Sequence, residues 1–145
     1  MSHVATMKLK VLSLDALKAA TKQLGLEFRE NQKQYKWFGT HVGDYPLPVG
    51  FTNADLGKCD HAIGVKGNPN AYEVGVVKNK NAPGYTLLWD FWAGGYGLQA
   101  VVGKDGKKLQ QEYAVQVTMR KQLSEGWQVE RRTDAKGNAY VYARG

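Results

Sequence analysis

The sequence predicts an α+β fold: an antiparallel sheet of about five to seven strands with two helices packed on one face. Several short segments alternate apolar and polar residues, which is typical of strands with one buried face. Two longer segments repeat apolar residues at helical spacing. Turn-forming residues separate successive strand candidates by short intervals, which favours antiparallel neighbours. At 145 residues, the chain is expected to form a single domain, 1–145, with its own hydrophobic core.

The first two elements have the clearest patterns. Residues 5–11 alternate apolar and polar side chains, which predicts a strand. Ser13 then occupies an N-cap position and Gly25 supplies a C-terminal stop, so we expect a helix between them. The apolar residues that recur at helical spacing within this segment are Leu14, Leu17, Ala20 and Leu24.

A hairpin and a long loop are expected next. The turn-forming residues 30–32 suggest a hairpin between residues 26–29 and 33–38. Residues 39–60 are rich in Gly, Pro and Asp and show no apolar period, so they predict a loop. Because long loops in compact domains usually serve binding or are disordered, we expect this segment to carry a feature specific to the protein.

The second half of the chain predicts a meander, a helix and a closing hairpin. Leu109, Tyr113, Val117 and Leu123 fall on roughly one side of a helix that Gly126 ends, although the β-branched residues within it weaken the helical pattern. The expected strands of the meander are residues 61–66, 71–78 and 85–92, and those of the closing hairpin are residues 127–132 and 139–143.

The charge of the chain favours acidic partners. Twenty Lys and Arg against thirteen Asp and Glu give a formal net charge of +7, which supports a preference for polyanions or acidic proteins. The basic residues are scattered, and no run of five or six occurs. A soluble surface with a cationic bias therefore explains the composition as well as a dedicated nucleic-acid face does.

Other features of the composition point to a cytoplasmic protein. The chain has no apolar segment of the length that a membrane span needs and no apolar signal-peptide core, so we expect a soluble protein with no membrane partner. Its one cysteine, Cys59, cannot form an internal disulfide, and nothing indicates an oxidising compartment. We expect Cys59 to be a small buried apolar group.

Both ends of the chain carry a resemblance to a known family. The chain opens with Met-Ser-His and the strand and helix just described, and Glu112-Tyr113-Ala114 and Glu125-Gly126-Trp127-Gln128-Val129 stand near its other end. In these segments it resembles the hypothetical chloroplast reading frame thirty-five family, a small domain of unknown function in plastids, cyanobacteria, other bacteria and phages. The middle of the chain matches poorly. The resemblance implies a fold and no chemistry.

Possible reactive groups lack the spacing of recognised motifs. Cys59, Asp60 and His61 lie together, with His41 earlier, but this spacing fits no known zinc ligand set, and we expect no metal and no cofactor. The glycine-rich stretch 94–97 follows a strand but lacks the spacing of phosphate-binding loops. A simple strand exit accounts for it.

Three residues of the apolar regions invite a functional interpretation. His3 stands just before the first strand, where it could be a ligand or acid–base group, or could fix the strand end. Asp90 lies in a strongly apolar run, where a raised pKa would suit proton transfer and a lysine partner would serve structure. By alternation, Trp92 faces away from the side shared by Trp89 and Phe91, which makes it a candidate stacking or interface residue.

These observations favour a small binding or adaptor protein without catalytic activity, with a protein as its partner. The alternative is a nucleic-acid or nucleotide-phosphate binding protein that uses basic and aromatic surface residues. A third hypothesis is an enzyme that uses His3 or Asp90, although no catalytic motif supports it. The residues expected to contact a ligand or partner are His3, Lys78, Lys80, Trp92, Tyr96, Arg120, Lys121, Arg131 and Arg132.

Overall fold

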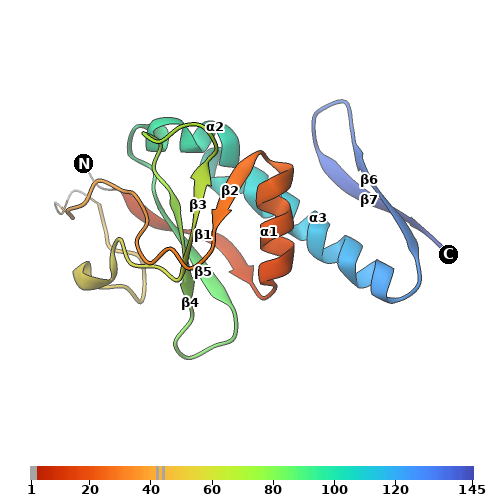
Figure 1. Cartoon of the computed structure of the whole chain (residues 1–145), viewed down its shortest axis with the longest axis horizontal. Coiled ribbons are helices and arrows are strands. Elements are labelled where there is room, and N and C mark those ends of the chain that lie inside the picture. Colours follow the sequence, from red (N-terminus) through yellow and green to blue (C-terminus); the bar gives the residue numbers. More distant parts are fainter. Residues whose placement is uncertain (1–2, 42, 44) are drawn as a thin grey trace.

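Within residues 3–41, 43 and 45–145, which the computed structural model describes, seven strands form a five-stranded antiparallel sheet and a separate hairpin. The order in the sheet is β1-β5-β4-β3-β2 (Figure 1). The predicted α+β class and antiparallel sheet are therefore confirmed. The strands are β1 (Val4–Val11), β2 (Leu26–Arg29), β3 (His61–Val65), β4 (Val74–Lys78), β5 (Tyr85–Asp90), β6 (Gln128–Thr133) and β7 (Ala139–Arg144).

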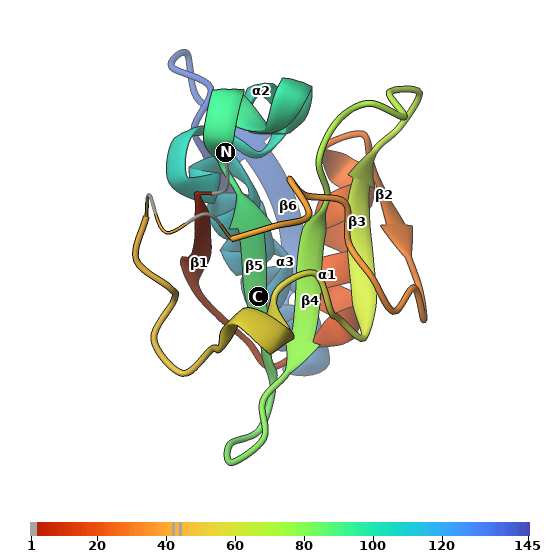
Figure 2. The ribbon, with the colours of Figure 1, turned by 90° about the vertical axis from the view of Figure 1, so that its left-hand side faces the viewer.

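Both predicted helices are present, and they cover the same face of the sheet. They are α1 (Leu14–Gln23) and α3 (Lys107–Ser124), and a third, short helix, α2 (Leu98–Val102), precedes α3. Ser13 caps α1 as expected, since its Oγ accepts the N–H of Ala16 at 3.1 Å. Figure 2 shows α1 and α3 behind the sheet. The buried side chains of this core include Met7, Val11, Ala16, Leu17, Ala20, Ile63, Val74, Val76, Leu87, Trp89, Leu109 and Tyr113.

A second, smaller core lies on the opposite face of the sheet, under residues 30–41, 43 and 45–60, which we call the second-face loop. It passes in front of the sheet in Figure 2. Tyr35 and Leu56 from the loop are buried against Val4 and Leu88 of the sheet, together with Cys59. The expectation of a buried Cys59 is thus met, and the face that the sequence left open is covered by a loop that includes a short 3-10 helix, Asn53–Asp55.

The predicted hairpin at residues 26–38 is wrong in its second strand. β2 forms, but it pairs with β3, where Phe28 lies opposite Ile63. Residues 33–38 instead cross the second face, and within the described chain their ladder contact is a single bridge between Gln34 and Lys58. The physical reason is burial, because the Tyr35 side chain packs into the second core, where a hairpin partner of β2 could not place it.

Two buried carboxylates hold the second-face loop in place. Glu73 accepts hydrogen bonds from the backbone N–H of Lys36 at 2.7 Å and from the Gln32 side chain, and it pairs with Arg29. Asp90 accepts a hydrogen bond from the backbone N–H of Phe38 at 3.2 Å, two residues farther along the loop than Lys36. Hydrogen bonds to ionised acceptors are stronger than neutral ones, so these residues replace the missing backbone ladder.

Candidate functional site

The structure distributes the nine candidate residues over separate places rather than one surface. Lys78 and Lys80 lie at the turn between β4 and β5, and His3 and Trp92 lie together at the opposite end of β5. Tyr96 is on a glycine-rich turn that follows Trp92. The other four lie on the second half of α3 and on β6: Arg120, Lys121, Arg131 and Arg132.

His3 and Asp90 are neighbours, and their contacts fix backbone. The N–H groups of His3 and Trp92 donate to Asp90 Oδ1 at 3.0 and 3.1 Å, and the N–H of Phe38 donates to Oδ2. The Asp90 side chain is fully buried, and its hydrogen bonds join the segments of His3, Phe38 and Trp92. Among the residues that the structure describes, it forms no ion pair with a lysine. The imidazole of His3 packs edge-on against Trp92, with ring centroids 5.0 Å apart, and beside Tyr45 and Phe91.

The glycine-rich turn has an unusual backbone. Residues 93–96 have φ between 52° and 66°, a left-handed conformation that glycine adopts readily and that Ala93 and Tyr96 adopt at a cost. The carbonyl of Gly95 accepts the N–H of Tyr72 at 2.8 Å, and the Tyr96 ring packs edge-on against Tyr72 at 5.0 Å. Through these two contacts, the turn holds Tyr72, which lies just before β4, in place.

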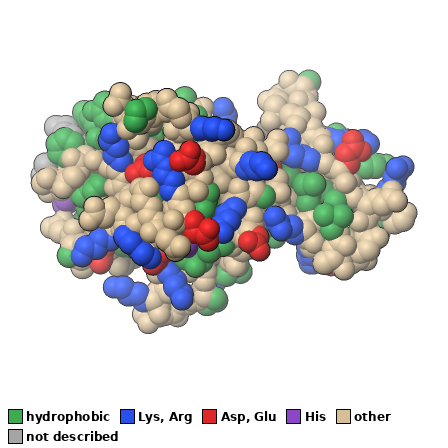
Figure 3. All heavy atoms as spheres, in the orientation of Figure 1, with side chains coloured by type: hydrophobic (Ala, Val, Ile, Leu, Met, Phe, Trp, Pro, Cys, Tyr) green, Lys and Arg blue, Asp and Glu red, His purple; other side chains and the backbone are tan. Residues whose placement is uncertain are grey.

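The C-terminal unit, which we define as residues 116–145, differs from the rest of the molecule. It contains the second half of α3 and the β6–β7 hairpin, and it projects from the body in Figure 1. None of its residues, all of which the structure describes, is buried. Figure 3 shows hydrophobic and basic side chains together on this projection. Its exposed large apolar side chains are Val117, Leu123, Trp127, Tyr140 and Tyr142.

The outer face of the hairpin combines aromatic and basic side chains. The register places Arg132 opposite Tyr140 and Glu130 opposite Tyr142, all on the more exposed side of the ribbon. The Arg132 guanidinium lies 4.0 Å from the centroid of the Tyr142 ring and also contacts Glu130 at 3.1 Å. Exposed Tyr and Arg side chains in this arrangement are typical of binding surfaces.

Arg131 points the other way, toward α3. Its guanidinium donates two hydrogen bonds to Glu112, from Nε to Oε2 at 3.2 Å and from Nη2 to Oε1. Glu112 is 2% exposed, and it also accepts a hydrogen bond from Gln116. Contact with Glu112 is the main cause that raises the pKa of Arg131. Arg131 therefore attaches the hairpin to the helix and is not open for a phosphate.

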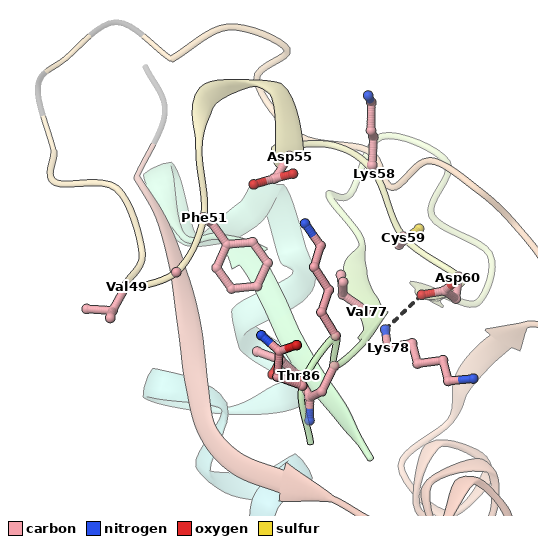
Figure 4. A pocket seen from close by; sticks show the side chains of 13 residues that line it. Val49, Phe51, Asp55, Lys58, Cys59, Asp60, Val77, Lys78 and Thr86 are labelled. Carbon is pink, nitrogen blue, oxygen red and sulfur yellow. Dashed lines mark hydrogen bonds between the residues drawn. The ribbon is translucent and has the colours of Figure 1, made fainter. Parts of the chain in front are cut away.

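A cavity lies on the second face of the sheet, beside Lys78 and Lys80. It has a volume of about 450 Å³ and is enclosed by the second-face loop and the β4–β5 turn (Figure 4). Phe51 and Val77 form an apolar wall, and Lys58 stands at the rim. We call it the lysine-rimmed cavity. Its other lining residues are Val49, Gly50, Asp55, Cys59, Asp60, Asn79, Asn81 and Thr86.

Cys59 contributes structure rather than reactivity at the cavity wall. Its Sγ donates to the carbonyl of Gln32 at 3.1 Å, and burial raises the pKa of the thiol to about 12. The thiolate that nucleophilic attack or metal binding requires is thus disfavoured. Among the described residues, no group of three or more His, Cys, Asp or Glu side chains is placed to hold a metal ion.

Comparison of the chain with protein-family models, curated proteins and solved structures found no match. The resemblance in the terminal segments stays a prediction. In the described part of the chain, no helix is both long enough and apolar enough to cross a bilayer.

Sequence reasoning missed several residues that shape these sites. Glu112 belongs to a segment that resembles the family, but its ion pair was not predicted. A glutamate next to Tyr113, near the apolar side of a predicted helix, does suggest a buried carboxylate with a partner. Phe51 and Lys58 of the cavity come from the loop, where no periodic pattern indicated which side chains would turn inward. Tyr140 and Tyr142 were not among the predicted site residues; strand alternation places both on one face of the closing hairpin, but it does not indicate that this face is exposed.

Proposed function

We propose that this chain is a binding or adaptor protein without catalytic activity, and that its C-terminal unit docks on the acidic and partly apolar surface of another protein. The observation that carries the proposal is the exposure of Leu123, Trp127, Tyr140 and Tyr142 on a unit without a buried residue. Tyr140 and Tyr142 share the exposed side of β7, and large apolar side chains grouped on a surface are characteristic of interaction sites.

The unit has the composition of an interface centre. Trp, Tyr and Arg dominate the residues that contribute most to protein–protein binding, and Trp127, Tyr140, Tyr142 and Arg132 supply all three types. A two-stranded hairpin is only marginally stable by itself, and here α3 covers just its inner face. A partner on the outer face would complete the packing.

The charge of this region favours an acidic partner over a second copy of the chain. From residue 104 onward, nine Lys and Arg stand against five Asp and Glu. Two of those acidic residues, Glu112 and Glu130, already pair with arginines. Two copies that met through this face would bring like charges together, which costs binding energy, whereas an acidic partner would gain it.

A nucleic acid is the second candidate, supported by the exposed tyrosines beside Arg132. Two placements weigh against it. Arg131 is held by Glu112, and Lys78 and Lys80 lie in the cavity on the second face of the sheet, so the expected phosphate contacts form no continuous track. Val117 and Leu123 of α3 are also exposed, and aliphatic side chains offer little to bases or phosphates.

The test compares two variants with matched exposure. Tyr140 and Tyr142 are 46% and 44% exposed, and Phe38, near the N-terminal end of the sheet, is 45% exposed. The tagged chain, the double variant Tyr140→Ser/Tyr142→Ser and the control Phe38→Ser are used for capture from native cells with and without nuclease. Each captured protein is then purified, and its affinity for all three chains is measured.

We expect one nuclease-resistant partner that binds the wild type and the Phe38→Ser control equally and the double variant at least roughly tenfold more weakly, as loss of about 1.4 kcal/mol implies. The partner should carry a net negative charge, and its affinity should fall as salt rises. Equal binding of the double variant would remove the C-terminal unit from the interface. Capture that disappears with nuclease would replace the protein partner by a nucleic acid.

A further inference from the structure

We propose that the lysine-rimmed cavity binds a small phosphorylated ligand of nucleotide size. The proposal is independent of the C-terminal unit, because the cavity is built from the second-face loop and the β4–β5 turn, on the face of the sheet that α1 and α3 do not cover. Its volume of about 450 Å³ is within the range of small-molecule sites, which is roughly 300–1,000 Å³.

One part of the cavity fits an apolar or planar group. Figure 4 shows the ring of Phe51 directed into the space beside Val77, which belongs to β4. Phe51 is half-buried and packs against the second core, so its position is fixed by the sheet. An exposed aromatic face in a cavity stabilises a stacked base or similar ring.

Another part of the cavity fits an anion. Lys58, Lys78 and Lys80 line it from three different positions of the chain, and all three are exposed. Within the described residues, none of the three forms an ion pair. In Figure 4 the ammonium groups of Lys58 and Lys78 extend outward from the mouth. Exposed lysine side chains change rotamer within nanoseconds, so they can turn over a bound phosphate.

The two carboxylates of the cavity are turned toward donors of the protein itself. Asp55 Oδ2 accepts the N–H and the hydroxyl of Thr52 at 2.8 and 3.0 Å. These bonds are the main cause that lowers the pKa of Asp55, and Lys80 and Lys58 add to it. Asp60 Oδ2 accepts the backbone N–H of Lys78 at 2.7 Å, the bond drawn in Figure 4. The cavity is therefore lined by three lysines and by two carboxylates that are already hydrogen-bonded to the protein.

Hydrogen bonds also fix the shape of the turn that carries the lysines. Thr86 Oγ1 donates to Asn79 Oδ1 at 2.6 Å, and Asn79 Nδ2 donates to the carbonyl of Pro83 at 3.2 Å. The N–H of Asn79 closes the turn on the carbonyl of Gly84 at 3.0 Å. A turn held in this way keeps Lys78 and Lys80 on the cavity side without a bound ligand, which lowers the entropic cost of binding.

The ring of Phe51 and the three lysines lie in the same cavity, and together they indicate the class of ligand. A simple anion would use the lysines and leave Phe51 and Val77 in contact with water. An apolar compound would leave three ammonium groups without a partner. A nucleotide satisfies both parts, with its base against Phe51 and its phosphates among the lysines.

The experiment measures binding of ATP, AMP, inorganic phosphate and a short oligothymidylate to the full chain by isothermal titration calorimetry at low salt. The cavity variant is Lys78→Ala/Lys80→Ala, which changes two exposed residues and should leave the melting temperature unchanged. The matched control is Lys22→Ala/Lys66→Ala, which removes the same charge from exposed positions outside the cavity. A second variant, Phe51→Ala, tests the apolar wall.

We expect ATP to bind more tightly than AMP, and AMP more tightly than phosphate. The cavity variant should bind ATP at least about tenfold more weakly than the control does, and Phe51→Ala should weaken AMP but not phosphate. Absence of ATP binding at roughly 1 mM, equal affinity in the cavity variant and the control, or tighter binding of oligothymidylate than of ATP would each overturn the proposal. These outcomes do not depend on whether the C-terminal unit binds a protein.

Discussion

The body of the molecule and its C-terminal unit contain similar apolar residue types but use them differently. In the body, Leu17, Leu87 and Leu109 are completely buried between the sheet and the helices. In the C-terminal unit, Leu123 is 56% exposed, and Trp127 and both tyrosines of β7 are nearly half exposed. The helix α3 belongs to both regions, since its buried residues end at Val115 and its exposed half continues for nine residues to Ser124.

The two regions differ in how much their apolar side chains contribute to folding. Burial of a leucine contributes about 2 kcal/mol to folding, so the body has strong reasons to keep its arrangement. The exposed residues of the C-terminal unit contribute little to folding, and they are free to contribute to binding. Function is therefore more easily changed in the unit without loss of the fold.

The first prediction compares the same substitution, leucine to alanine, in the two regions. Leu17→Ala should lower the free energy of unfolding by about 3 kcal/mol, because it leaves a cavity in a fully buried site. Leu123→Ala should change it by less than about 0.5 kcal/mol, because the side chain is already in water. Urea denaturation followed by tryptophan fluorescence measures both values. A loss of comparable size in Leu123→Ala would show that the unit has a core of its own.

The same division explains how much could be predicted from the sequence. β1 and α1 were predictable because their apolar residues recur with the period of a strand or helix and face one core. The pattern of α3 was correct only in part, since Leu109 and Tyr113 are buried whereas Val117 and Leu123, predicted on the same side, are exposed. The path of residues 33–38 was not predictable, because it depends on the burial of Tyr35 and on hydrogen bonds to Glu73 and Asp90, distant residues that no local pattern marks.

The candidate sites show the same limit. The basic character of the C-terminal region was visible in the composition, but sequence could not show that Arg131 and Arg132 have opposite surroundings. Strand alternation places Arg131 and Arg132 on opposite sides of the hairpin, and this can be predicted from the sequence. The side that α3 covers is known only from the tertiary structure. The lysine-rimmed cavity was partly anticipated through Lys78 and Lys80, while its aromatic wall came from the loop.

The second prediction concerns the ion pair that joins the two regions. Arg131→Ala should lower the free energy of unfolding by about 3 kcal/mol, because it leaves the buried carboxylate of Glu112 without its bidentate partner. Arg132→Ala, the adjacent control on the exposed face, should leave the free energy of unfolding nearly unchanged, because its pair with Glu130 is exposed to solvent. Hydrogen exchange should show faster exchange of β6 and β7 amides in Arg131→Ala alone. Equal effects in the two variants would contradict the assigned role of Arg131.

The third prediction compares the helix-covered face of the sheet with the loop-covered face. The Tyr113 hydroxyl accepts the N–H groups of Leu12 and Ser13 at 3.0 and 3.1 Å, so Tyr113→Phe should cost about 1–3 kcal/mol. The buried Tyr35 hydroxyl lies near the backbone of Gly57 but forms no hydrogen bond of good geometry among the described residues. Tyr35→Phe should therefore leave stability unchanged or raise it by up to about 1 kcal/mol. Thermal unfolding measures both, and a large loss in Tyr35→Phe would mean that its hydroxyl is satisfied.

The ionisation of Tyr35 makes the stability of the protein depend on pH in the alkaline range. Burial raises the pKa of Tyr35 to about 12, whereas an unfolded tyrosine ionises near pH 10. Between about pH 10 and pH 12, the Tyr35 phenol ionises in the unfolded chain but stays protonated in the folded protein. The contribution of Tyr35 to stability is therefore fully present below about pH 10 and is lost as the pH rises toward 12. The wild type should lose stability over this interval, and Tyr35→Phe should lose less, since it has no phenol to ionise in the unfolded chain. Parallel losses in the two proteins would assign the alkaline transition to groups other than Tyr35.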